Sequence, residues 1–235
     1  MADLTPQDTE IPISETDPHV LPVLDLGSPV SEQYRRLYSK LLYIQRERGD
    51  KVVAITSTSK GEGKTLTAVN LALVMARDTN KRVLLVDLDL RHPKVADSIG
   101  IKTPRGLVKV IENKISLVDG FIKLKNEGLF ILPAGEVPSN PIQFLAEEKL
   151  APIMMKLKKW FDFVIVDTPP IMPIPDYDFI NRQVDSFIMV VRWGCTQKDH
   201  VLSALDSCGR DRILGIVFNA AVGGTSTYYH YGYYK

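Results

Sequence analysis

Residues 52–65 read VVAITSTSKGEGKT, an apolar run that leads into a loop with two glycines. The apolar run predicts a buried β-strand, and a helical pattern of apolar residues begins at Leu66. Gly61 and Gly63 let the backbone curl so that successive N–H groups point toward one centre. The helix that starts near Lys64 adds the positive end of its dipole there. These residues therefore predict a strand, a phosphate-binding loop and a helix, in that order.

The loop has the spacing of the Walker A motif, except that Thr58 stands in place of the leading glycine. We expect Lys64 to contact the β- and γ-phosphates of a nucleotide and the Thr65 hydroxyl to take a position on Mg²⁺. An accidental Gly-rich turn is the alternative, and the order of strand, loop and helix disfavours it. The expected nucleotide-binding residues are Ser59, Lys60, Gly61, Glu62, Gly63, Lys64, Thr65 and Leu66.

The rest of the chain alternates short apolar runs with helical patterns. Continuous apolar strands separated by helices imply a parallel sheet that is covered on both faces. We therefore predict an α/β fold of the P-loop NTPase type, with a mostly parallel sheet and helices on both faces. The expected strands are 52–56, 82–86, 129–133, 163–166, 186–192 and 213–219; the expected helices start at Ser31 and near Lys64, with others near 105–112, 141–159, 176–182 and 198–208.

Acidic residues follow two of these strands. Asp87 and Asp89 come after one apolar run, and Asp167 comes after another. Because ligands of open α/β sheets bind beyond the carboxyl ends of the strands, these acids should lie beside the phosphate loop. We expect Asp87 to bind Mg²⁺ directly or through water, and Asp167 to act as the Walker B acid through a metal-bound water. Asp89 is the candidate base or orienting group for an incoming hydroxyl.

An aspartate at the end of a strand is also a common capping device, but two such strands beside a phosphate loop favour a site. Lys64, Asp87, Asp89 and Asp167 are thus the expected catalytic residues, and Thr65, Asp87 and Asp167 the expected metal-binding residues. Three further residues are candidates for nucleotide contacts. Arg91 either steadies phosphate charge or pairs with an acid, while Arg192 and Asn219, at strand ends, are candidates for the adenine.

Both ends of the chain differ in composition from the predicted domain at residues 30–219. Residues 1–29 contain five prolines, which predicts a mobile Pro-rich arm, although residues 20–26 could pack on the domain. Residues 220–235 predict a flexible tail with a root-mean-square reach of about 20–25 Å. The tail carries a tyrosine cluster of Tyr228, Tyr229, Tyr231, Tyr233 and Tyr234.

The Walker A loop, the Asp-x-Asp-x-Arg run at residues 87–91 and the DTPP run at residues 167–170 together resemble bacterial tyrosine kinases. The resemblance is greatest to the free-standing CpsD/CapB-like autokinases of capsule and exopolysaccharide systems. It covers residues 31–235 and includes the terminal tyrosines and the LPAG run at residues 132–135.

This resemblance implies an ATP- and Mg²⁺-dependent protein-tyrosine autokinase that regulates exopolysaccharide or capsule synthesis or export. It implies that the terminal tyrosines accept phosphate between subunits of a homo-oligomer, either a ring or a dimer. Glu32 and Arg35 fit the family's oligomer motif on the first helix, but Tyr38 stands where the motif has arginine. The resemblance further implies a cytoplasmic chain recruited to the inner face of the cell membrane by a membrane-embedded polysaccharide co-polymerase, which activates it.

The composition of the chain disfavours several other classes of protein. A formal net charge of +1 gives no support for nucleic-acid binding, and two cysteines are too few for a disulfide framework. No apolar run approaches the ~18 residues of a membrane span. A partition or septum-positioning ATPase remains the second interpretation. Such ATPases carry a signature lysine where this chain has Ser59, and they lack the tyrosine tail.

Overall fold

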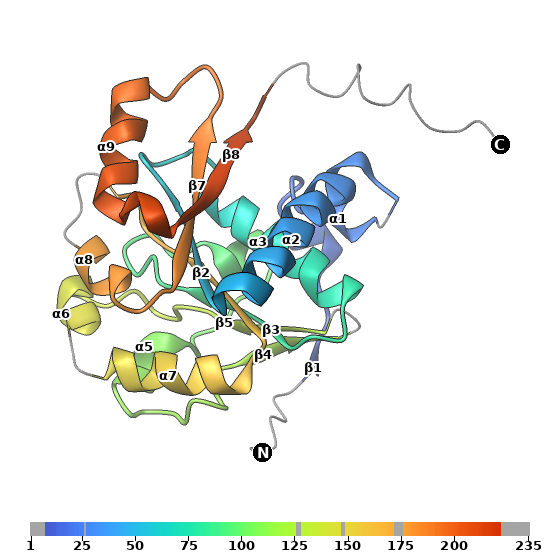
Figure 1. The fold of residues 1–235 in the computed structure, drawn as a ribbon. Coiled ribbons are helices and arrows are strands. Elements are labelled where there is room, and N and C mark those ends of the chain that lie inside the picture. The colour runs from blue at the N-terminus through green and yellow to red at the C-terminus, as the bar shows by residue number, and fades with distance from the viewer. Residues whose placement is uncertain (1–7, 26, 126–127, 147–148, 172–175, 222–235) are drawn as a thin grey trace.

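The computed structural model describes residues 8–25, 27–125, 128–146, 149–171 and 176–221, and its centre is one eight-stranded sheet (Figure 1). The strand order is β1-β4-β5-β3-β6-β2-β7-β8, and β4–β5 is the one antiparallel pair among these strands. The strands are β1 Asp8–Thr9, β2 Val52–Ser57, β3 Val83–Asp87, β4 Ile122–Leu124, β5 Leu129–Leu132, β6 Phe163–Asp167, β7 Ser186–Arg192 and β8 Ile213–Asn219.

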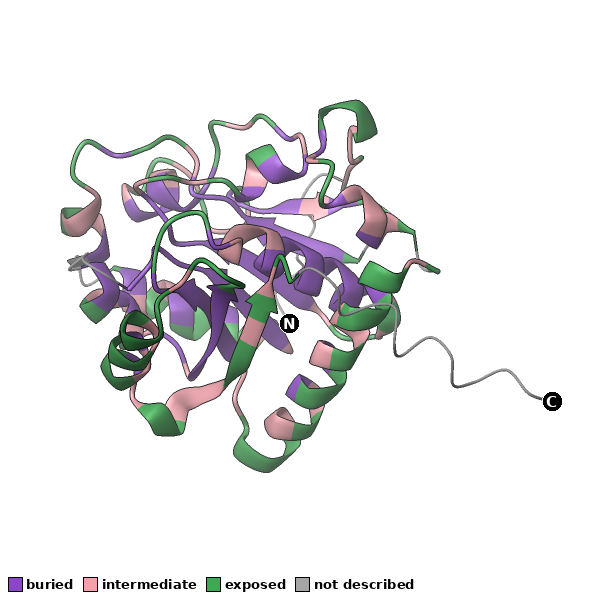
Figure 2. Cartoon of the chain, turned by 90° about the horizontal axis from the view of Figure 1, so that it is seen from above, coloured by how far each residue is buried: buried purple, intermediate pink, exposed green. Residues whose placement is uncertain are grey.

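Helices cover both faces of the sheet, and buried residues gather between the layers (Figure 2). Side chains of α1 to α4 pack with one face, and side chains of α5 and α7 to α9 pack with the other. The helices are α1 Leu21–Leu24, α2 Pro29–Arg48, α3 Lys64–Asp78, α4 Val95–Ser98, α5 Leu107–Ile111, α6 Pro141–Ala146, α7 Leu150–Trp160, α8 Asp176–Asn181 and α9 Lys198–Cys208, with 3₁₀ turns at Ile13–Glu15 and Arg210–Arg212. None of the helices in the described residues is long and apolar enough to cross a membrane.

The central strands explain why two helix layers form. Val52 and Ala54 of β2 lie in one hydrophobic core, whereas Val53 and Ile55 lie in the other. This alternation follows from the two-residue period of a strand, and a run that is apolar at every position buries both faces. The predicted fold class is confirmed, and the six predicted strands agree with the structure within a residue at each end.

The N-terminal segment differs from the mobile arm that we expected. Within residues 8–25, β1 pairs with β4, which was not expected. The side chains of Val20 and Val23 are fully buried, in agreement with the packing that we allowed for residues 20–26. The Arg77 guanidinium of α3 donates hydrogen bonds to the carbonyl oxygens of Val23 and Leu24, which lie at the end of a helix too short to satisfy them itself. Prolines remove backbone donors, but they do not prevent packing of the apolar side chains between them.

Three smaller details also differ from the sequence prediction. Ser28 caps α2 by accepting a hydrogen bond from the Ser31 backbone N–H, so the helix begins at Pro29 rather than Ser31. The single helix expected over 141–159 consists of α6 and α7. The short elements β1, β4, α1 and α4 were not predicted, because four residues or fewer carry no readable period.

Asp185 holds the start of β2, the strand that leads into the phosphate loop. Its carboxylate accepts hydrogen bonds from the backbone N–H groups of Lys51 and Val52 and pairs with Lys158. Burial alone would raise the pKa of Asp185, but the Lys158 ammonium and the two backbone donors hold it below its ordinary value. A lowered carboxyl pKa stabilises the fold above the unfolded-state pKa, and this contribution is lost as the pH falls through the folded-state pKa.

We therefore expect Asp185→Asn to reduce the free energy of unfolding by about 1 kcal/mol near neutral pH. The difference should shrink toward zero at an acid pH below the lowered folded-state pKa of Asp185, where the wild-type carboxyl is itself protonated. Urea denaturation of both chains at the two pH values measures this. An equal loss at both would mean that the charge of Asp185 contributes nothing.

Candidate functional site

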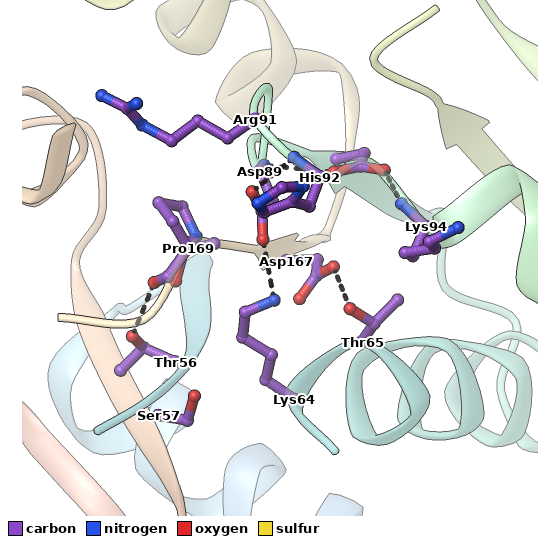
Figure 3. Close-up of polar contacts among 12 residues, drawn as sticks. Thr56, Ser57, Lys64, Thr65, Asp89, Arg91, His92, Lys94, Asp167 and Pro169 are labelled. Atoms are coloured by element: carbon purple, nitrogen blue, oxygen red, sulfur yellow. Dashed lines mark hydrogen bonds and ion pairs between the residues drawn. The ribbon is translucent and has the colours of Figure 1, made fainter. Parts of the chain in front are cut away.

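The carboxyl ends of β2, β3 and β6 meet at one edge of the sheet. Asp87 and Asp167 are directly paired residues of β3 and β6, and the Leu88 N–H donates to the Asp167 carbonyl at 2.8 Å. The Thr56 hydroxyl donates to the Pro169 carbonyl at 3.2 Å, which joins the ends of β2 and β6 (Figure 3). Hydrogen bonds beyond the sheet therefore hold the two acidic strand ends beside the phosphate loop.

A cleft of about 680 Å³ opens at this edge. All the expected nucleotide-binding residues line it except Glu62. Asp89 also lines the cleft, together with five residues that sequence analysis missed: Asp17, His92, Lys94, Ser98 and Pro170. His92 and Lys94 follow the acidic strand directly and could have been found from that position, whereas no local pattern marks Asp17.

Lys64 and Asp89 form an ion pair inside the cleft. The Lys64 ammonium lies 2.8 Å from Asp89 Oδ2, and the two side chains are 12% and 3% exposed (Figure 3). Burial alone would lower the pKa of Lys64, but the carboxylates of Asp167, Asp89 and Asp87 raise it above its ordinary value. The ammonium therefore stays charged, and Asp89 holds it where the cleft begins.

Asp167 and Thr65 form the second contact between the loop and the acidic strands. The Thr65 hydroxyl donates to Asp167 Oδ2 at 2.7 Å, while the buried Asp167 Oδ1 has no hydrogen-bond partner among the described residues. Burial raises the pKa of Asp167 above its ordinary range. Burial and then the neighbouring Asp167 raise the pKa of Asp87 as well.

Asp87 is held by backbone groups. One carboxylate oxygen accepts from the Asp89 N–H, and the other accepts from the N–H groups of Lys94 and Val95, where α4 begins. Asp87 therefore has a structural task in addition to any role at the metal. Its satisfied oxygens favour contact with a cation through water rather than directly.

The donor set fits a magnesium ion. Three buried carboxylates lie near one half-buried ammonium, and Asp167 Oδ1 lacks a partner among the described residues. A further cation would therefore balance the charge and give this oxygen a partner. The described residues contain no cluster of three or more His, Cys, Asp or Glu side chains that could hold a metal alone. Mg²⁺ suits such a site because it binds through one or two protein oxygens and keeps water and phosphate oxygens as its other ligands.

Arg91, Arg192 and Asn219 each make hydrogen bonds within the chain. Arg91 pairs with the buried Asp176 through two hydrogen bonds of 2.7 and 2.9 Å, which supports the ion-pair alternative. Arg192 donates to the Gly61 carbonyl, and Asn219 donates to the Glu62 carbonyl. Both residues therefore contact the backbone of the phosphate loop in this structure.

The structure describes the candidate residues for oligomer contact but not those for phosphate acceptance. Arg35 of α2 pairs with Asp78 of α3 at 2.7 Å and with Glu32 at 3.3 Å, so it helps to join these two helices within the chain. The terminal tyrosines at positions 228–234 lie outside the described residues. Both expectations remain predictions.

Removing the charge of Asp167 should stabilise the fold and at the same time lower the activity of the site. We expect Asp167→Asn to raise the unfolding midpoint of the nucleotide-free, metal-free chain by a few degrees, because it removes a buried charge that lacks full compensation. The same substitution should lower the rate of the reaction that takes place at this site by at least about 100-fold. Thermal unfolding in a chelator measures the first effect. Asp185→Asn is the matched control and should lower the midpoint, so a fall in both variants would contradict the argument.

Comparison with known proteins supports these observations. Residues 50–191 match the model of an AAA domain family. The chain is 32% identical over 218 residues to tyrosine-protein kinase YwqD of Bacillus subtilis, which covers 92% of this chain and 91% of YwqD. It is 28% identical to tyrosine-protein kinase wzc of Salmonella typhi over 91% of this chain, but that match spans only 30% of the relative.

Solved structures of a tyrosine kinase domain and of a second protein also resemble this chain. The kinase domain of Escherichia coli tyrosine kinase ETK superposes with a TM-score of 0.81 and 26% identity, covering 93% of this chain and 86% of that domain. The septum site-determining protein MinD of Pyrococcus horikoshii, complexed with Mg-ADP, has a TM-score of 0.62 at 22% identity, covering 72% of this chain and 69% of MinD. The second likeness supports the fold alone.

Proposed function

The chain belongs to the bacterial tyrosine kinase family, and we propose that it transfers the terminal phosphate of ATP to tyrosines in the C-terminal segment of a neighbouring copy of the same chain. Its enzyme class is thus protein-tyrosine kinase. The observation that supports the reaction most directly is that Lys64 and Asp89 meet in one cleft beside the phosphate loop, where Thr65 donates a hydrogen bond to the buried Asp167.

Nucleotide binding requires Lys64 to change partners. In the structure its ammonium pairs with Asp89, and a phosphate in the cleft would compete for the same charge. Backbone N–H groups at the start of α3 favour phosphate at this position. Thr65 and Asp167 would hold Mg²⁺, with Asp87 contributing through water. When bound, this ion would neutralise charge that develops on the phosphate oxygens.

Asp89 would then assist the acceptor. A tyrosine hydroxyl has a pKa of about 10 and is a poor nucleophile at neutral pH. Once Lys64 turns to the phosphate, Asp89 Oδ2 is released from its ion pair and can accept the hydroxyl proton. Asp89 Oδ1 accepts a hydrogen bond from the His92 N–H, which keeps the carboxylate oriented at the cleft.

The tail is suited to act as substrate. Residues 228–235 provide five tyrosine hydroxyls and no acidic side chain that would be repelled by the acidic site. Each phosphate adds about −1.5 to −2 charges. Several phosphates on one tail would repel one another and the buried aspartates, so a modified tail would leave the site. Phosphorylation would in this way control assembly of the homo-oligomer, with Glu32 and Arg35 of α2 as candidate contacts.

We place the kinase in control of capsule or exopolysaccharide synthesis or export, recruited from the cytoplasm to the inner face of the membrane. Its activator would be a membrane-embedded polysaccharide co-polymerase. The relative wzc is consistent with such a context because it carries the matching region within a longer chain. Adding the cytosolic segment of the co-polymerase should raise turnover. Equal turnover with and without that segment would contradict this part of the proposal.

A partition or septum-positioning ATPase remains the second candidate, because the fold that the chain shares with MinD does not by itself separate the two functions. Incubation of the purified chain with ATP and Mg²⁺, followed by anti-phosphotyrosine blotting and measurement of ADP, separates the two functions. A kinase gives phosphotyrosine in proportion to ADP. Release of ADP without phosphotyrosine would favour the ATPase and would overturn the kinase proposal.

A further inference from the structure

Glu62 is the residue of the phosphate loop that turns away from the cleft. It is 4% exposed, although it lies between Gly61 and Gly63 in a loop at the molecular surface. A buried carboxylate in a loop that should attract phosphate is unfavourable unless it is fully hydrogen-bonded. Its partners therefore indicate why it is there.

Three donors satisfy the Glu62 carboxylate. The Thr58 hydroxyl lies 2.8 and 2.9 Å from the two oxygens, and the Ser59 backbone N–H donates at 3.0 Å. The Thr196 hydroxyl, from the turn after β7, donates to the other side of the carboxylate. The Thr196 oxygen itself accepts from the Arg192 N–H, and its hydroxyl lies closer to the Glu62 carboxylate than to its other acceptor, the Arg192 carbonyl at 3.3 Å. One side chain thus joins the beginning of the loop, its middle and the β7 turn.

Two further donors hold the backbone of the same residues. Arg192 Nη1 donates to the Gly61 carbonyl at 3.2 Å, and Asn219 Nδ2 donates to the Glu62 carbonyl at 2.9 Å. In a planar trans peptide, a carbonyl and the next N–H point in opposite directions. Holding these two carbonyls therefore fixes the directions of the Glu62 and Gly63 N–H groups.

Gly63 allows this arrangement. Its φ is +92°, and a Cβ on it would lie 1.9 Å from Asn219 Nδ2. The glycine therefore serves a close approach of the Asn219 side chain as well as the curl of the loop.

We propose that Glu62, with Thr58 and Thr196, is a clamp that positions the phosphate loop from its outer side. Glu62 is a positioning residue, since it acts through the backbone donors and does not line the nucleotide cleft. The clamp also explains the departure from the Walker A motif, because a glycine at position 58 could not supply the hydroxyl that Glu62 accepts. The inference rests on the proposed nucleotide site.

Calorimetric titration with ADP and Mg²⁺ tests the clamp. Thr58→Val and Thr196→Val should each weaken ADP binding about tenfold, the effect of one lost hydrogen bond to a charged group. Glu62→Ala, which loses the acceptor of all three donors, should weaken it at least as much. Thr58→Gly, which restores the motif, should also weaken it, whereas Thr58→Ser should restore affinity to about that of the wild type. Because Thr58 acts through Glu62, the double variant Glu62→Ala/Thr58→Val should bind no more weakly than Glu62→Ala alone.

Thermal unfolding separates positioning from a merely structural role. Ser116→Ala is the matched control, since it removes an exposed hydroxyl–carboxylate hydrogen bond to Asp119 elsewhere in the chain. The clamp variants should lower the unfolding midpoint more than this control, because they leave buried polar groups without partners, but they should still be folded at the titration temperature. Ser116→Ala should bind ADP with wild-type affinity. Wild-type affinity for ADP in Glu62→Ala and Thr58→Val, or tighter binding by Thr58→Gly, would overturn the clamp. Failure of the unaltered chain to bind ADP would instead remove the nucleotide site itself, and the clamp with it.

Discussion

Lys64→Met lowers the rate of phosphate transfer to tyrosine by at least about 100-fold in our account, while the chain remains folded. Methionine keeps an unbranched side chain but removes the buried ammonium that pairs with Asp89. In the nucleotide complex this ammonium would stabilise charge on the transferred phosphate. Its loss therefore affects the transition state as well as binding. Initial rates of phosphotyrosine formation at saturating ATP measure the effect.

Lys81→Met is the control for this substitution. Lys81 is exposed and lies before the start of β3, at the opposite end of that strand from Asp87. Lys81→Met removes the same charge from the chain as Lys64→Met but leaves the cleft unchanged. The rate of phosphotyrosine formation should therefore stay within about twofold of the wild type. Similar rates in Lys64→Met and wild type would exclude Lys64 from the chemistry.

The second large effect concerns the acceptors. Replacing Tyr228, Tyr229, Tyr231, Tyr233 and Tyr234 together by phenylalanine should abolish phosphate incorporation, because phenylalanine keeps the ring and removes the nucleophilic hydroxyl. ADP binding should be unchanged, since the substitutions leave every residue that lines the described cleft as it is. Quantitative phosphotyrosine analysis beside an ADP titration measures both outcomes.

Tyr43→Phe provides the matched control. Tyr43 lies on α2, and its side chain is 67% exposed, so it is an accessible tyrosine outside the tail. If exposure alone made a tyrosine an acceptor, Tyr43→Phe would reduce incorporation. We expect no change. Persistent phosphorylation of the chain that lacks the five tail tyrosines would show that the acceptor lies elsewhere.

The fold and the centre of the site were predictable because their signals are local. The phosphate loop lies within one strand–loop–helix unit, and the acids stand directly after apolar runs that form β3 and β6. Parallel strands bring such positions to one edge whatever their order in the sheet. Local spacing and strand polarity were therefore sufficient to predict that Lys64, Asp87, Asp89 and Asp167 lie near one another at one edge of the sheet.

The remaining features depend on contacts between distant residues. Arg91 finds Asp176, 85 positions later, and Glu62 finds Thr196, 134 positions later. Asp17 enters the cleft because the N-terminal segment packs on the domain, where its own N–H donates to the Ser98 carbonyl. No local period encodes these pairings. The sequence could therefore name Arg91 and Glu62 but could not assign their partners.

Mixing two inactive chains tests the central claim most directly. One chain carries Lys64→Met with an intact tail, and the other carries an intact site with the five tail tyrosines replaced by phenylalanine. After incubation with ATP and Mg²⁺, mass spectrometry should find phosphate on the tail of the Lys64→Met chain in the mixture, and on neither chain alone. Consumption of ATP by the mixture with no phosphorylated tail tyrosine would contradict the account.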